Sequence, residues 1–175
     1  MSVAIGAAAP EFTLPDTDGS PTSLENGESA ATVVVFTCNH CPYALAWHER
    51  LQAVARDYQA RGVRTLQINA NDAARYPSDS PAAMAARVSA REFAGPYLRD
   101  DTQEVARAWG AAVTPDVYVL DGTGRLAYHG APDADYGDES LAAGWLREAL
   151  EDVLAGRPVV RAETRPVGCS IKWRV

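Results

Sequence analysis

The sequence predicts an α/β fold, a mixed sheet with helices on both faces, and three observations support it. Residues 32–36 are apolar and mostly β-branched without alternation, which is typical of a strand buried on both faces. From Pro42 onward, apolar side chains recur at helical spacing, and residues 63–70 again resemble a strand. Strand, helix and strand in this order favour parallel strands joined by a right-handed crossover.

The remaining elements follow from turn signals and periodicity. A turn at residues 16–19 separates two short extended segments and predicts an N-terminal hairpin. After a polar segment at residues 71–79, interpreted as a connector or a lid, Ser80 and Pro81 begin a helix that is expected to reach about residue 93. A second hairpin is expected around Asp121 and Gly122, followed by an amphipathic helix at residues 138–155.

Length and composition indicate one domain. The 175 residues are 47% apolar, enough for a single core, so we expect one domain over residues 1–175, with an N-terminal extension (1–31) and an extended C-terminal tail (157–175). The net charge of −7 with 16 Lys and Arg argues against nucleic acid or an anionic membrane as a partner. The chain has no apolar run of about 18 residues, and we expect a cytoplasmic protein.

The expected working site is the segment from Thr37 to Pro42, at the junction of the buried strand and the first helix. Two cysteines separated by two residues can form one disulfide, and the positive end of a helix can stabilise a thiolate. Cys38 is therefore the predicted nucleophile, with a lowered pKa, and Cys41 its resolving partner. His40, Thr37 and Pro42 are expected to modulate the pair.

A third cysteine lies in the tail, where apolar and polar residues alternate. Cys169 shares the apolar side of this predicted strand with Val167, Ile171 and Trp173. We expect a buried, inert thiol there. The alternative is a third redox-active cysteine that folds back to Cys38 or Cys41.

The same residues also permit a metal-binding module. Cys38, His40 and Cys41 are suitable ligands for Cu(I) or zinc, with His48 and His129 as more distant histidines. Cysteine pairs in a reducing compartment are more typical of redox or metal sites than of structural disulfides. Thiol–disulfide exchange needs no cofactor and no metal, and it is the preferred interpretation.

The whole pattern resembles the thioredoxin fold. Residues 6–14, Asp18-Gly19 and the tail at residues 167–173 are similar to the peroxiredoxin-like subgroup related to alkyl hydroperoxide reductase and thiol-specific antioxidant. This resemblance implies a cis peptide bond between Thr114 and Pro115 that faces the cysteines and leaves the Thr114 backbone open to an extended substrate.

The resemblance implies an enzyme, a thiol–disulfide oxidoreductase. Its expected partners are protein or small-molecule disulfides and an unidentified thiol electron donor. A thiol-dependent peroxidase with an antioxidant role is the alternative. The chain departs from typical relatives because Thr37 replaces a tryptophan and because the peroxidase pattern Pro-x-x-x-Thr-x-x-Cys is missing.

Overall fold

The computed structural model describes residues 2–25, 27 and 29–175. The strands are β1 (Phe12–Pro15), β2 (Pro21–Leu24), β3 (Ala31–Phe36), β4 (Val63–Asn69), β5 (Tyr97–Arg99), β6 (Val113–Thr114), β7 (Asp116–Leu120), β8 (Leu126–Gly130) and β9 (Cys169–Ser170). The helices are α1 (Pro42–Gln59), α2 (Pro81–Ser89), α3 (Glu104–Trp109) and α4 (Gly144–Leu154), and η1 (Pro77–Asp79) is a 3-10 turn. Within the described ranges, no helix combines the length and apolarity needed to cross a membrane.

The central sheet has five strands in the order β5-β4-β3-β7-β8. Strands β3, β4 and β5 run parallel, whereas β7 and β8 add antiparallel pairs. All six residues of β3 are buried, as expected for a β-branched strand in the middle of a sheet. The predicted mixed sheet, the parallel strand–helix–strand unit and the hairpin of β7 and β8 are therefore confirmed.

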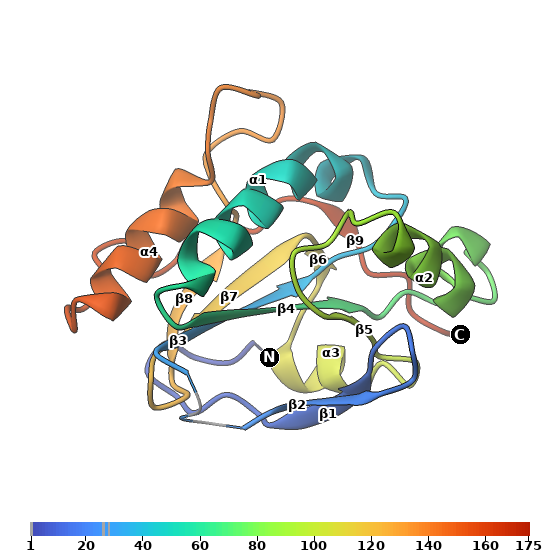
Figure 1. The fold of residues 1–175 in the computed structure, drawn as a ribbon, viewed down its shortest axis with the longest axis horizontal. Helices are drawn as coiled ribbons and strands as arrows, with labels where there is room; N and C mark the ends of the chain where they lie inside the picture. Colours follow the sequence, from blue (N-terminus) through green and yellow to red (C-terminus); the bar gives the residue numbers. More distant parts are fainter. Residues whose placement is uncertain (1, 26, 28) are drawn as a thin grey trace.

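Helices cover both faces of this sheet. Figure 1 shows α1 and α4 on one face, and α3 with the β1–β2 hairpin on the other. Alternate residues of β3 reach the two cores: Val33 and Val35 pack under α1 and α4, whereas Val34 and Phe36 pack toward Trp109 of α3. The sheet thus holds the C-terminal end of β3 between two apolar layers, and this end leads directly into the cysteine motif.

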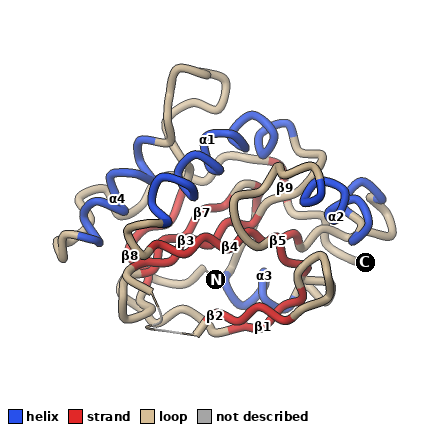
Figure 2. The backbone as a smooth tube through the Cα atoms, in the orientation of Figure 1, coloured by secondary structure: helices blue, strands red, loops and turns tan. Residues whose placement is uncertain are grey.

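Two helices are shorter than expected. Helix α2 ends at Ser89 instead of near residue 93, and α4 begins at Gly144 instead of residue 138. The segment before α4 forms a loop because the buried carboxylate of Asp133 accepts a hydrogen bond from the Ala143 N–H, at 3.0 Å, and Ala143 adopts a left-handed φ of 57°. Figure 2 shows this loop projecting beyond α1.

The C-terminal tail is extended, but its strand is only two residues long. Strand β9 pairs antiparallel with β6, outside the central sheet. The predicted apolar side is confirmed, because each of its four residues packs against a core cluster: Val167, Cys169, Ile171 and Trp173. The tail therefore docks on the body of the protein beside the segment that precedes Pro115.

Candidate active site

The cysteine motif lies where β3 passes into α1, as the sequence predicted. Thr37 is buried, and its N–H continues the parallel ladder by donating to the Ile68 carbonyl at 2.8 Å. Cys41 is the N-cap of α1, and Pro42 occupies the first turn, where it needs no hydrogen-bond partner for a backbone N–H. Cys38 and Cys41 are both almost fully buried, with exposed fractions of 2% and 0%.

Thr114 contacts both cysteines. Its hydroxyl lies 3.4 Å from Cys38 Sγ, and its carbonyl oxygen lies 3.3 Å from Cys41 Sγ, which donates to it only while Cys41 is protonated. The peptide bond between Thr114 and Pro115 is cis, as the resemblance implied. However, the expectation that the Thr114 backbone is open to a substrate is wrong for this conformation, because Thr114 pairs with Cys169 of the chain's own tail.

The tail brings Cys169 into the site. Cys169 is half-buried and packs in one cluster with Cys38, Cys41 and Ala44. Its thiol lies close enough to Cys41 to contribute to lowering the pKa of Cys41. The expected burial of Cys169 is therefore only partial, and the structure places all three cysteines together.

Of the two thiols in the motif, Cys41 loses its proton more easily. The hydrogen bond from Cys38, assisted by Cys169 and by the Ala44 N–H, outweighs burial and lowers the pKa of Cys41 to about 4. The Ala44 N–H contributes electrostatically without the geometry of a full cap hydrogen bond. Donating to Cys41, burial and the charge of Asp79 all raise the pKa of Cys38. The predicted low pKa of Cys38 is therefore wrong in this conformation, because the neighbouring Cys41 thiol and burial both raise it.

An aspartate that the sequence analysis did not single out lies beside the motif. Asp79, in η1, is fully buried, and Oδ1 accepts hydrogen bonds from the Asn39 N–H at 2.7 Å and the Asn69 amide at 3.0 Å. Oδ2 accepts from the Asn71 amide at 3.1 Å and lies 2.5 Å from Nδ1 of His40. Because Asp79 follows Asn39 by 40 positions and lies in a polar segment, no local spacing in the sequence signals this contact.

The middle of the motif is anchored by neighbouring elements. The Asn39 side-chain oxygen accepts hydrogen bonds from the Tyr97 hydroxyl at 2.7 Å and from Arg87 at 2.9 Å. The His40 ring is partly exposed and stacks on Tyr76, with 5.5 Å between ring centroids. Asn39 therefore holds the loop to α2 and β5, whereas His40 remains accessible at the rim of the site.

One group in the described part of the chain has the arrangement of a metal site. Ligand atoms of Cys38, His40 and Asp79 lie within 4.8 Å of one another. Sulfur, imidazole and carboxylate together suit zinc. The other two histidines have different partners, since His48 contacts the Glu92 carbonyl at 2.6 Å and His129 contacts Asp116 at 2.6 Å.

The thiolate is expected to be visible by ultraviolet absorbance. With the pKa of Cys41 lowered to about 4, the reduced protein should carry one thiolate at neutral pH and lose it as the pH falls through that value. Cys41→Ser should abolish this signal, whereas Cys169→Ser should retain it. A thiolate that persists in Cys41→Ser and disappears in Cys38→Ser would contradict the assignment.

Removing the charge of Asp79 is expected to lower the pKa of Cys38, since that charge is one of the causes that raise it. The Cys41→Ser background isolates Cys38, so the pH dependence of its alkylation can be compared with and without Asp79→Asn. Asp72→Asn is the matched control, because Asp72 is also buried but caps the Ala74 N–H instead. Equal pH profiles for the two aspartate variants would refute the effect.

Two solved structures resemble the protein over nearly its whole length. An uncharacterized conserved protein from Geobacillus kaustophilus is 40% identical with a TM-score of 0.92, and the match covers 98% of this chain and 93% of that one. A hypothetical protein from Sinorhizobium meliloti 1021 is 38% identical with a TM-score of 0.93, covering 100% and 97%. A search among curated proteins finds no match.

A more distant structure has the same fold. A putative thiol:disulfide interchange protein DsbE from Chlorobium tepidum is 17% identical with a TM-score of 0.70, and the match covers 87% of this chain and 99% of that one. The predicted thioredoxin-like fold is thereby confirmed. Residues 5–129 match the model of the AhpC/TSA family, a segment that includes both cysteines of the motif and Thr114 but ends before the tail. Since this segment is well over half of the chain, the protein belongs to the AhpC/TSA family of thioredoxin-fold thiol oxidoreductases and peroxidases.

Proposed function

We propose that the protein is a thiol–disulfide oxidoreductase that uses Cys38 and Cys41 as its dithiol. The observation that carries this proposal is the buried pair at the N-terminus of α1, where Cys38 and Cys41 pack together and both sulfurs contact Thr114. The neighbouring Cys38 thiol lowers the pKa of Cys41 to about 4. A thiolate is the reactive form of cysteine, and a second thiol in contact with it can release a bound partner quickly.

The charge distribution favours attack by Cys41, the reverse of the order expected from the sequence. The Cys41 thiolate attacks one sulfur of a substrate disulfide, forms a mixed disulfide and releases the other sulfur as a thiolate. A second thiol then loses its proton, attacks Cys41 Sγ and releases the remaining substrate thiol. When Cys38 performs this step, the products are two substrate thiols and a Cys38–Cys41 disulfide, which an external thiol donor must reduce.

Flanking residues support this chemistry by position. The Thr114 hydroxyl faces Cys38, and Pro42 sets the first turn of the helix that Cys41 caps. His40 is partly exposed and, when protonated, adds a positive charge near the pair. The neighbouring Thr37 fixes the chain to β4 through its N–H, so the cysteines are held by the rigid sheet.

A thiol peroxidase is the second candidate, supported by membership of the AhpC/TSA family. In that reaction the Cys41 thiolate attacks a peroxide oxygen, gives a sulfenic acid and an alcohol or water, and the sulfenic acid condenses with Cys38 with loss of water. Counted from Cys41, the position of the threonine in the peroxidase pattern is occupied by Cys38 itself. This substitution favours disulfide exchange over efficient peroxide reduction.

A zinc or Cu(I) binding module is the third candidate, favoured by the group of Cys38, His40 and Asp79. However, both carboxylate oxygens of Asp79 already accept hydrogen bonds from the surrounding amides. An ion would have to compete with these contacts and with the proton that Cys38 retains. The three side chains are therefore of the kind that bind zinc or Cu(I). Their existing hydrogen bonds favour the role of Cys38 as a thiol of the dithiol over its role as a metal ligand.

The test is reduction of insulin and of a small disulfide by protein that was treated with a chelator. The wild type should turn over both substrates with a dithiol donor, and the double variant Cys38→Ser with Cys41→Ser should not. Peroxide consumption is measured in parallel, so faster turnover of peroxide than of disulfides would favour the peroxidase. Retention of zinc or copper through chelation, with no turnover of either substrate class, would favour the metal-binding module.

A further inference from the structure

The tail places a third thiol at the dithiol through a defined strand register. Strand β9 pairs antiparallel with β6, with Cys169 opposite Thr114 and Ser170 opposite Val113. Thr114 is the residue that contacts both Cys38 and Cys41. This register therefore sets the Cys169 side chain against the pair, where it packs in one cluster with Cys38 and Cys41.

The tail is seated there by close packing. A Cβ atom on Gly168 would lie 2.1 Å from the Thr114 carbonyl oxygen, so only glycine allows the two backbones to approach this closely. Beyond β9, Ile171 is 3% exposed, and the Lys172 backbone donates to Asn71 at 2.9 Å and accepts from the Asp72 N–H at 2.8 Å. The position of Cys169 is thus determined on both sides of β9.

The two thiols that contact Cys41 differ in their surroundings. Cys38 is almost fully buried and lies near the negative charge of Asp79. Cys169 is half-buried, and Lys172 places a positive charge near it. Burial, followed by the hydrogen bond and charge of Cys41, raises the pKa of Cys169 to about 11. The contributions of Cys41 disappear once its sulfur has formed a mixed disulfide, because that sulfur is then neutral.

We propose that Cys169 is a third redox-active cysteine, which attacks the mixed disulfide on Cys41 and forms a Cys41–Cys169 disulfide at the surface of the site. This role rests on the proposed function, since Cys41 must first react with a substrate disulfide. It makes the C-terminal tail a built-in partner of the dithiol, occupying the backbone edge of Thr114.

The steps balance with the substrate disulfide as the only oxidant. The Cys41 thiolate attacks RS–SR′, the Cys41–SR bond forms, and R′S⁻ leaves. The Cys169 thiol then attacks Cys41 Sγ, the Cys41–Cys169 bond forms, and its proton leaves with RS⁻ as RSH. Cys38 can next attack Cys41 Sγ and give its proton to Cys169, which moves the disulfide to the buried pair and regenerates the Cys169 thiol.

The test traps the tail disulfide in the full chain. Reduced Cys38→Ser protein is mixed with one equivalent of oxidised glutathione, quenched with an alkylating agent and analysed by mass mapping. The expected product is a Cys41–Cys169 disulfide. It should form at least about tenfold faster than free glutathione reduces the Cys41–glutathione mixed disulfide, because Cys169 and Cys41 are held in contact.

A matched variant keeps the number of cysteines and moves the thiol by one position. Cys38→Ser combined with Cys169→Ser and Ser170→Cys places the tail thiol on the exposed side of β9, where residue 170 faces away from the pair. This variant should accumulate Cys41–glutathione and no tail disulfide. Gly168→Ala in the Cys38→Ser background should also reduce the yield of the tail disulfide, because the added methyl group displaces β9 from Thr114.

The outcomes separate this proposal from the proposed function. If Cys38→Ser accumulates Cys41–glutathione while Cys169 remains alkylated, Cys169 is not redox-active, although the dithiol function stands. If the wild type shows all three cysteines alkylated after the same treatment, both proposals are overturned. Equal yields of tail disulfide with the thiol at residue 169 or at residue 170 would also overturn the role of the register.

Discussion

Replacing Cys41 with serine is expected to slow disulfide reduction by about 1,000-fold or more, since the variant lacks the thiolate that attacks. Cys38 remains in this variant, but it is buried beside the charge of Asp79 and no longer has a thiol partner in the motif. The measurement is the single-turnover release of the first thiol from a small disulfide, followed at neutral pH.

Cys38→Ser is the matched control for this prediction. A serine hydroxyl can still donate a hydrogen bond to Cys41, so the first thiol should be released at a rate within about tenfold of the wild type, whereas turnover through a Cys38–Cys41 disulfide is lost. The reverse pattern, with fast release from Cys41→Ser and none from Cys38→Ser, would restore Cys38 as the nucleophile.

The features of the site that depend on local sequence could be predicted. The apolar run at β3, the helical stripe of α1 and the spacing of Cys38 and Cys41 determine a strand-to-helix junction with two adjacent thiols. These features lie within about 20 residues of one another, and hydrophobic periodicity predicts secondary structure over segments of that length. The same holds for the β7–β8 hairpin around its Asp-Gly turn.

The distribution of charge in the site could not be predicted in this way. Which cysteine holds the thiolate depends on which of them caps α1 and on the partners of each sulfur: Thr114, Cys169 and the buried Asp79. These residues come from β6, β9 and η1, far from the motif in sequence. Predicted helix starts are uncertain by one or two residues, so the sequence alone does not determine that Cys41 is the N-cap of α1.

Asp133→Ala is expected to lower the free energy of unfolding by about 3–5 kcal/mol, the usual loss when one partner of a buried ion pair is removed. Asp133 is 4% exposed and accepts hydrogen bonds from Arg50 at 2.9 Å, from the Trp47 indole at 2.8 Å and from the Ala143 N–H. Its loss leaves these donors buried with fewer acceptors. Urea unfolding followed by tryptophan fluorescence measures the change.

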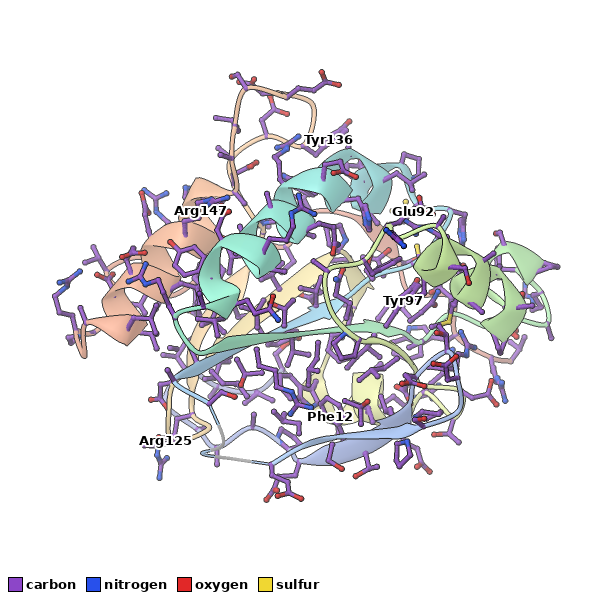
Figure 3. All side chains as sticks on the ribbon, in the orientation of Figure 1. Phe12, Glu92, Tyr97, Arg125, Tyr136 and Arg147 are labelled. Atoms are coloured by element: carbon purple, nitrogen blue, oxygen red, sulfur yellow. The ribbon has the colours of Figure 1, made fainter. Side chains whose placement is uncertain are left out.

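Asp57→Ala is the control for Asp133→Ala. Asp57 also pairs with an arginine, Arg147, at 2.9 Å, but its side chain is 56% exposed, so the expected loss is at most about 1 kcal/mol. Figure 3 labels Arg147 on α4, from which it reaches Asp57 of α1. Equal losses for the two variants would show that the buried network of Asp133 adds no more than a surface pair.

The Asp133 network also supports the site, so its loss should change thiol reactivity. Arg50, which binds Asp133, also donates to the carbonyl of Tyr136, which Figure 3 labels near the N-terminal half of α1. The centroid of the Tyr136 ring lies 4.4 Å from that of Tyr43, which packs against the cysteine cluster. Loosening this loop should uncover the first turn of α1. We therefore expect Asp133→Ala to increase the alkylation rate of Cys41 under native conditions, whereas Asp57→Ala should leave it unchanged. An unchanged rate in a destabilised Asp133→Ala protein would show that the loop does not shield the thiolate.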